Sequence, residues 1–138
     1  MEQEDKELLL RDLCARLPYG VKVKTNNIHI LRLGTHTRVG EYVTDVTEPC
    51  KPYLFPLSSM TEGQTEEVHN LIYQGVSESI EETKEWLKTR KENELRPITL
   101  TYILSYTLVI DWFCKNHFDY RGLIPMGLAI DCTNLNIY

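Results

Sequence analysis

The chain has 138 residues, with 15 Lys and Arg residues against 20 Asp and Glu residues, for a formal net charge of −5. A chain of this length can form one core and bury about two thirds of the surface that it exposes when unfolded. We therefore expect a single globular domain over residues 1–138. The basic residues are scattered, which argues against a general nucleic-acid binder, because neutralising phosphates requires a clustered Lys and Arg surface. A local basic face remains compatible with this charge.

The cysteines and the hydropathy pattern predict a cytoplasmic protein. The four cysteines, at positions 14, 50, 114 and 132, lie far apart and form no CxxC motif, so we expect free thiols in a reducing compartment. The sequence shows no signal peptide, and no apolar run approaches the ~20 residues of a bilayer span. We accordingly expect no membrane partner.

The first element is an expected helix over Glu2–Leu17. Acidic residues in its first turn complement the helix dipole, and leucines recur at the helical period. Pro18 and Gly20 end the pattern.

Two alternating segments, Val21–Thr25 and Ile28–Leu33, flank a two-residue turn at 26–27 and predict a β-hairpin. The turn places Val23 opposite Ile30 on the face expected to be buried. The residues expected on the other face are Lys22, Lys24 and His29, with Arg38 nearby. Such a face suits a small anion or RNA, while a solvated strand face is the simpler interpretation.

The middle of the chain predicts a third strand and two helices. Gly40–Val46 alternates as a strand and would complete a three-stranded meander. Three prolines predict an irregular surface connection over residues 47–58. Ser59–Glu62 matches a capping box, so a helix should begin near Thr61. Ser77–Asn93 is typical of a second helix with a solvated, charged face.

The C-terminal part predicts a helix, a structured loop and a strand. Ile98–Leu104 has strand-like composition but continues into a helical pattern, and we expect a short extended segment there. A buried helix over Tyr106–His117, a turn at Asp119–Gly122 and a strand at Gly127–Asp131 follow. The whole pattern predicts an α+β fold, in which a small antiparallel sheet packs with about four helices. That sheet is the N-terminal meander, which the C-terminal strand can join.

The loop after this helix collects the side chains best suited to chemistry. The candidate binding residues are His117, Asp119, Tyr120 and Arg121. Arg offers a fork for an anion and His a proton, so an acid/base site or a phosphate grip is one interpretation. The structural alternative is a capped turn, with Asp119 bonded to backbone or to Arg121 and Tyr120 packed.

Cys114 and His117 are three residues apart on the expected helix, a spacing that can chelate zinc. A structural zinc site needs two further ligands, and Cys114 also continues an apolar face, so we predict no metal site. The same pair as nucleophile and base leaves little room for a substrate. We predict no catalytic residue and no cofactor.

Three segments resemble a group of small proteins from Bacteroides-type gut bacteria and from their phages, prophages and mobile elements. The segments are LLLRDLCARLPYGVKV (8–23), YLFPLSSMT (53–61) and, above all, Asp111–Asp131 with its HFDYRGLI block. The resemblance covers about a third of the chain. It implies a bacterial or phage origin but no activity, because the group has no assigned activity. Where many of those proteins have Leu-Asn-Ala after the tryptophan, this chain has Phe113-Cys114-Lys115.

These observations favour a small non-enzymatic accessory or interaction protein, carried by a phage or mobile element, with an unknown protein as its partner. The alternative is an enzyme or a nucleotide or phosphate binder that uses the loop residues His117, Tyr120 and Arg121. The sequence contains no pattern that indicates an oligomeric state.

Overall fold

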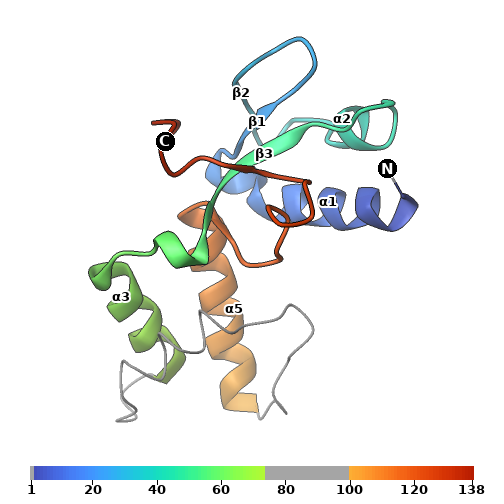
Figure 1. The fold of residues 1–138 in the computed structure, drawn as a ribbon. Helices are drawn as coiled ribbons and strands as arrows, with labels where there is room; N and C mark the ends of the chain where they lie inside the picture. The colour runs from blue at the N-terminus through green and yellow to red at the C-terminus, as the bar shows by residue number, and fades with distance from the viewer. Residues whose placement is uncertain (1, 74–99) are drawn as a thin grey trace.

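The computed structural model describes residues 2–73 and 100–138 (Figure 1). The helix expected over Ser77–Asn93 lies outside these residues. The α-helices of the described residues are α1 (Gln3–Arg16), α2 (Gly40–Val43), α3 (Glu62–Tyr73) and α5 (Leu100–Lys115). The strands are β1 (Lys22–Lys24), β2 (Leu31–Arg32), β3 (Lys51–Pro56), β4 (Phe118–Asp119) and β5 (Ile130–Asp131). Two short 3₁₀ turns occupy Leu17–Tyr19 and Leu57–Ser59.

The five strands form one small mixed sheet, so the predicted α+β class is confirmed. The strand order is β2-β1-β3-β4, and β5 also pairs with β3. The expected C-terminal strand does join the sheet, but both β4 and β5 run parallel to β3. The sheet is therefore not purely antiparallel. β3 lies at its centre in Figure 1, between the N-terminal hairpin and the C-terminal segments.

The central strand is the segment in which we expected an irregular connection, and that expectation is wrong. Pro52 stands opposite Val23 of β1. Leu33 N–H donates to Val21 O, so the backbone groups of Val21, and of Val23 two residues later, point to β2 and away from β3. Pro52, opposite Val23, therefore needs no N–H for pairing with β1. Pro56 closes the strand. The prolines occupy tolerated positions, so they do not prevent pairing.

The third strand expected over Gly40–Val46 is also wrong, because Gly40–Val43 forms the short helix α2. Val39 and Val43, four residues apart, are both buried. This helical spacing places both side chains against the core, and it outweighs the weaker alternation of the segment. Thr44 closes the turn by donating from Oγ1 to Gly40 O.

The hairpin forms, but its register is one residue away from the expected one. Thr25 N–H donates to Ile28 O across the two-residue turn, as expected. Farther along, Val23 pairs with Leu31 rather than with Ile30, so the second strand contains one extra residue. A one-residue slip exchanges the two faces of a strand. Ile30 is consequently 51% exposed, and Ile28, beside the turn, is 46% exposed.

The other helices expected within the described residues are present, with shifted ends. α1 matches its prediction, and α3 begins at Glu62, near the predicted Thr61. The capping box is formed by Thr61 and Gln64 instead of Ser59 and Glu62: each side chain accepts from the other's backbone N–H. α5 begins at Leu100, so the part of the expected extended segment from Leu100 to Leu104 is helical.

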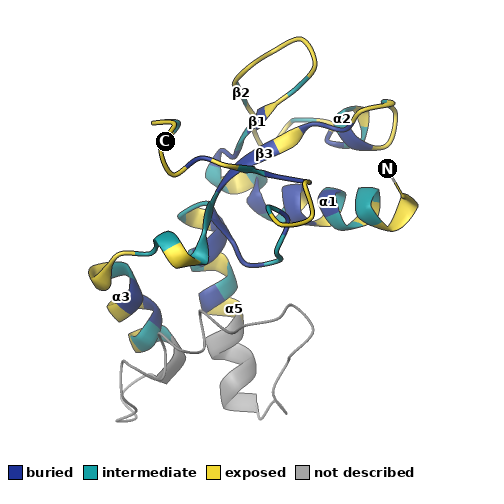
Figure 2. Ribbon diagram, viewed as in Figure 1, coloured by how far each residue is buried: buried dark blue, intermediate teal, exposed yellow. Residues whose placement is uncertain are grey.

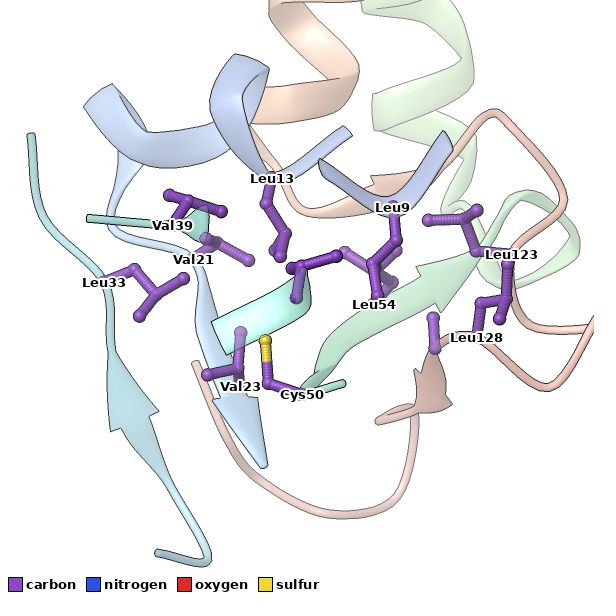
Figure 3. Packing of buried hydrophobic residues seen from close by; sticks show 12 residues of the cluster. Leu9, Leu13, Val21, Val23, Leu33, Val39, Cys50, Leu54, Leu123 and Leu128 are labelled. Atoms are coloured by element: carbon purple, nitrogen blue, oxygen red, sulfur yellow. The ribbon is translucent and has the colours of Figure 1, made fainter. Parts of the chain in front are cut away.

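Burial follows two apolar clusters (Figure 2). The first lies between α1 and the sheet and includes Leu9, Leu13, Val23 and Leu54 (Figure 3). The second joins α3, α5 and β4, and its buried members are Val68, Val109, Phe113, Cys114, Phe118 and Tyr120. The loop after α5 runs from the second cluster to the first, which places the candidate site residues in the interior.

Candidate functional site

The loop begins with an unusual backbone conformation at His117. His117 has φ 64°, in the left-handed region, which is uncommon for a residue other than glycine. Its N–H donates to Cys114 O, and its carbonyl accepts from Phe55 N–H of β3. The left-handed turn ends α5 and directs Phe118 and Asp119 into parallel pairing with β3. The break in the helix is thus fixed by the sheet.

Asp119 is used to hold the backbone of its own loop. Its two carboxylate oxygens accept the N–H groups of Leu123 and Ile124, each at 2.9 Å. The residue is 6% exposed. Gly122, with φ 76°, supplies the left-handed turn between Asp119 and the N–H groups that it accepts. This arrangement corresponds to the capped-turn alternative for Asp119.

Arg121 reaches back to the N-terminal helix. Its Nε lies 3.2 Å from Asp12 Oδ1, and Arg16 Nε donates to Asp12 Oδ2 at 2.8 Å. The side chains of Asp12 and Arg16 are both 0% exposed. Arg16 also donates from Nη2 to Phe118 O at 2.7 Å. Burial alone would lower the pKa of Arg16, but the Asp12 carboxylate outweighs it and raises that pKa.

Tyr120 lies between these charges and the aromatic cluster. Its ring stacks on Phe113, with centroids 5.8 Å apart. The guanidinium carbons of Arg16 and Arg121 lie 5.4 and 4.9 Å from the ring centroid, within the range of cation–π attraction. Burial raises the pKa of Tyr120 to about 12 and also raises the pKa of the Cys114 thiol. Both groups stay protonated at neutral pH, so neither is an activated nucleophile.

His117 points away from the other three residues, toward the C-terminal tail. Its ring stacks on Tyr138, with centroids 3.6 Å apart and an interplanar angle of 7°. Burial, together with the positive charges of Arg16 and Lys22, lowers the pKa of His117 to about 4. The imidazole is neutral at pH 7, which makes it a weak base.

The C-terminal tail packs on its own chain. The hydroxyl of Tyr138 accepts from Lys22 N–H and donates to Tyr53 O. Lys22 Nζ in turn donates to Ile137 O at 2.7 Å. These contacts hold the tail across β1 and β3, an attachment that the sequence did not reveal.

The structure thus brings the four predicted site residues into one loop but directs their side chains to different internal partners. Arg121 already contacts the carboxylate of Asp12 through Nε, so a phosphate would compete with that carboxylate for its guanidinium. Binding through this loop stays a hypothesis. Sequence reasoning missed Asp12 and Arg16, and the available signal was an acid-to-base pair at i,i+4 spacing on the leucine face of α1.

Metal-ligating side chains are dispersed over the described ranges 2–73 and 100–138. In them, no group of three or more His, Cys, Asp and Glu side chains could hold a metal ion. The four thiols are free, and those of Cys50, Cys114 and Cys132 are buried. Burial raises the pKa values of Cys50 and Cys132 to about 11. These thiols fill the interior as small apolar groups.

A second candidate surface is the outer face of the N-terminal hairpin. Lys22 of β1 stands directly opposite Arg32 of β2, and Lys24 of β1 stands directly opposite Lys51 of β3. Directly opposed residues lie on the same side of a sheet, and so do residues two apart on one strand. All four cations therefore share the face opposite the buried Val23. We call Lys22, Lys24, Arg32 and Lys51 the cationic face.

The cationic face lacks counter-charges within the described part of the chain. The ion pairs found there join Arg16 and Arg121 to Asp12 and Arg38 to Glu41. Lys24, Arg32 and Lys51 are exposed, whereas Lys22 is half-buried by its contacts with the tail. The sequence analysis grouped Lys22 and Lys24 correctly, but Arg32 and Lys51 required the register and the position of β3.

Comparison of the chain with protein-family models, with curated proteins and with solved structures finds no significant match. Across the described residues, no helix combines the length and apolar character needed to cross a bilayer.

Proposed function

We propose that the protein is a small non-enzymatic interaction protein and that the cationic face, with the neighbouring Ile28 and Ile30, is its contact surface for a protein partner. The observation that carries this proposal is the pairing of like charges. Both cross-strand pairs, Lys22 with Arg32 and Lys24 with Lys51, place a cation opposite a cation. Like charges in directly opposed positions destabilise a sheet. A surface that lowers stability in this way is better explained by binding than by folding.

The charge of the whole chain strengthens this argument. Acidic residues outnumber basic ones by 20 to 15, yet residues 13–40 contain no Asp or Glu. Three of the four cations of the face, Lys22, Lys24 and Arg32, therefore lie in a stretch of the sequence that contains no acid. Two large apolar side chains, Ile28 and Ile30, are exposed beside them. A mixed apolar and charged surface of this kind is typical of protein-binding sites.

The resemblance of the chain supports a proposal for its origin. The HFDYRGLI block and its flanking segments are similar to proteins of Bacteroides-type bacteria and their phages. We therefore place the protein in the cytoplasm of such a host, as an accessory protein encoded by a phage or a mobile element. Its partner would then be a host or phage protein.

A comparison of two charge-reversed variants tests the contact surface. Lys24→Glu with Lys51→Glu alters the cationic face, and Arg11→Glu with Lys115→Glu alters exposed cations elsewhere. Each replacement of a cation by Glu subtracts two charges, so both variants change from −5 to −9. Tagged proteins are used to capture partners from the lysate of a Bacteroides-type host, after circular dichroism has shown that they fold. We expect a partner retained by the parent and the control variant but lost by the cationic-face variant. Equal retention by all three would reject the proposal.

A further inference from the structure

The inference concerns the kind of partner and rests on the proposed function. β2 is the terminal strand of the sheet, with β1 as its only neighbour in the strand order of the described residues. Leu33 N–H donates to Val21 O, so Leu31 and Leu33 direct their backbone groups to β1. In an antiparallel pair the intervening residue directs its groups to the opposite side. The backbone N–H and C=O of Arg32 therefore point to the open edge.

We propose that the open edge of β2 accepts an extended acidic segment of a protein partner as an added strand. The backbone of Arg32 would supply hydrogen bonds, and its guanidinium would face a carboxylate of the added strand. Neighbouring strands lie about 4.8 Å apart. Lys24, one strand farther in, is within reach of a second, longer acidic side chain. Lys51, on β3, is too far for contact and attracts the added strand only through its charge. Ile30, directly before β2, adds an exposed apolar side chain next to this edge.

Protection of the edge against self-association does not explain this charge pattern. Cations on an edge strand discourage pairing between copies of a chain, and Arg32 fits that purpose. Lys24 and Lys51 do not, because β1 and β3 are interior strands. A second copy is also a poor occupant, because antiparallel pairing of two β2 edges would bring their Arg32 side chains together. These interior cations instead suit a partner of opposite charge.

An acidic protein segment fits the surface better than a nucleic acid does. A nucleic acid carries phosphates beyond any short contact, and the acidic remainder of this chain, with net charge −5, would repel them. Sequence-tolerant nucleic-acid surfaces also present aromatic side chains on which bases stack. The hairpin residues from 21 to 33 contain no Phe, Trp or Tyr. They present exposed isoleucines instead, which suit apolar side chains of a peptide.

Binding of synthetic peptides tests the inference directly. The probe is fluorescein-labelled Glu-Thr-Glu-Val-Glu-Thr-Glu, and its charge control has Gln at each Glu. Two further peptides keep the acids but carry N-methyl groups on alternate residues, one set on each edge of the strand. A labelled ten-nucleotide oligo(dT) represents nucleic acid. Fluorescence anisotropy measures affinity, and amide hydrogen exchange of the ¹⁵N-labelled parent reports protection at Arg32.

Strand addition predicts a specific pattern of results. The acidic peptide binds about tenfold or more tightly than its Gln control, and one of the two N-methylated peptides loses about tenfold in affinity because its donors are blocked. Exchange at the Arg32 amide slows only in the presence of the acidic peptide. Lys24→Glu with Lys51→Glu weakens binding without changing the far-UV spectrum.

Three results would overturn the inference, and they separate it from the proposed function. Equal binding of both N-methylated peptides and the parent peptide would show charge attraction without strand addition. Tighter binding of the oligonucleotide would show a nucleic-acid surface. Absence of binding by every probe, together with loss of a captured protein in the cationic-face variant, would reject the acidic strand while leaving the contact surface in place.

Discussion

Replacement of Asp12 by Asn should destabilise the protein more than removal of the guanidinium of Arg121 does. Asn keeps the shape of the side chain but removes the charge that faces Arg16 Nε at 2.8 Å and Arg121 Nε at 3.2 Å. Arg16 is 0% exposed, so its guanidinium would remain buried without an opposite charge. Removing one partner of a buried ion pair costs about 3–5 kcal/mol. Domains of this kind have a total stability of about 5–15 kcal/mol.

The matched variant is Arg121→Met, which removes the other partner of Asp12. The Arg121 side chain is 18% exposed, and Asp12 keeps its hydrogen bond to Arg16. The loss should therefore be about 1–2 kcal/mol. The difference between the two variants measures the importance of the fully buried Asp12–Arg16 pair, because the carboxylate remains in the second variant.

Urea denaturation, followed by tryptophan fluorescence and circular dichroism, provides the measurement. With a slope of about 1–3 kcal/mol per molar urea, the Asp12→Asn variant should unfold at a midpoint about 2 M below that of the parent. Arg121→Met should lower the midpoint by about 1 M or less. An Asp12→Asn midpoint equal to or above that of Arg121→Met would refute the argument that Asp12 neutralises a buried charge.

Three further changes test other parts of the structure. Burial lowers the pKa of His117 from 6.5 to about 4, so the unfolded chain binds more protons between these values and stability falls as the pH drops through this window. The loss of stability between pH 7 and pH 4.5 should be about 2 kcal/mol after allowance for partial exposure. In urea titrations at these two pH values, the loss should be smaller for His117→Asn, since Asn tolerates the left-handed backbone but does not titrate. Gly20→Ala should cost about 1–3 kcal/mol, because Gly20 has φ 67° and a Cβ there would lie 2.5 Å from Arg32 Nε. Gly34→Ala has open space around it, and in thermal denaturation a melting temperature of Gly20→Ala equal to that of Gly34→Ala would contradict the reasoning. Tyr138→Phe keeps the ring but loses two hydrogen bonds to backbone groups; we expect a loss of about 1 kcal/mol and faster amide exchange in the tail, and unchanged exchange would show that the hydroxyl does not anchor it.

The sequence predicted elements whose signals are local. α1 follows from its leucine period and from Pro18, and the hairpin follows from its two-residue turn. The register of the hairpin does not follow, because an extra residue after Ile28 shifts the second strand and exchanges its faces. β3 was not predicted, because proline normally indicates a break in a strand. Proline is tolerated here because the backbone groups of the opposite residue in β1 point to β2.

The candidate site was likewise predictable only where its signals are local in the sequence. The spacing of Asp12 and Arg16 is visible in the sequence, but their burial is not, because the groups that cover them arrive about a hundred residues later with Phe118 and Arg121. The loop residues were recognised as a cluster, while the directions of their side chains depend on α1 and the tail. The cationic face required the strand order, since Lys51 joins Lys24 only through β3.

Site-specific photocrosslinking in cells tests the central claim, that the hairpin edge contacts a protein partner. The photoreactive residue p-benzoylphenylalanine replaces Ile30, which is 51% exposed, and in a separate control it replaces the exposed Arg11 of α1. The account predicts a discrete crosslinked protein from position 30 and none from position 11, with loss of the product when Lys24→Glu and Lys51→Glu are added. A discrete product from position 11 but none from position 30 would contradict it.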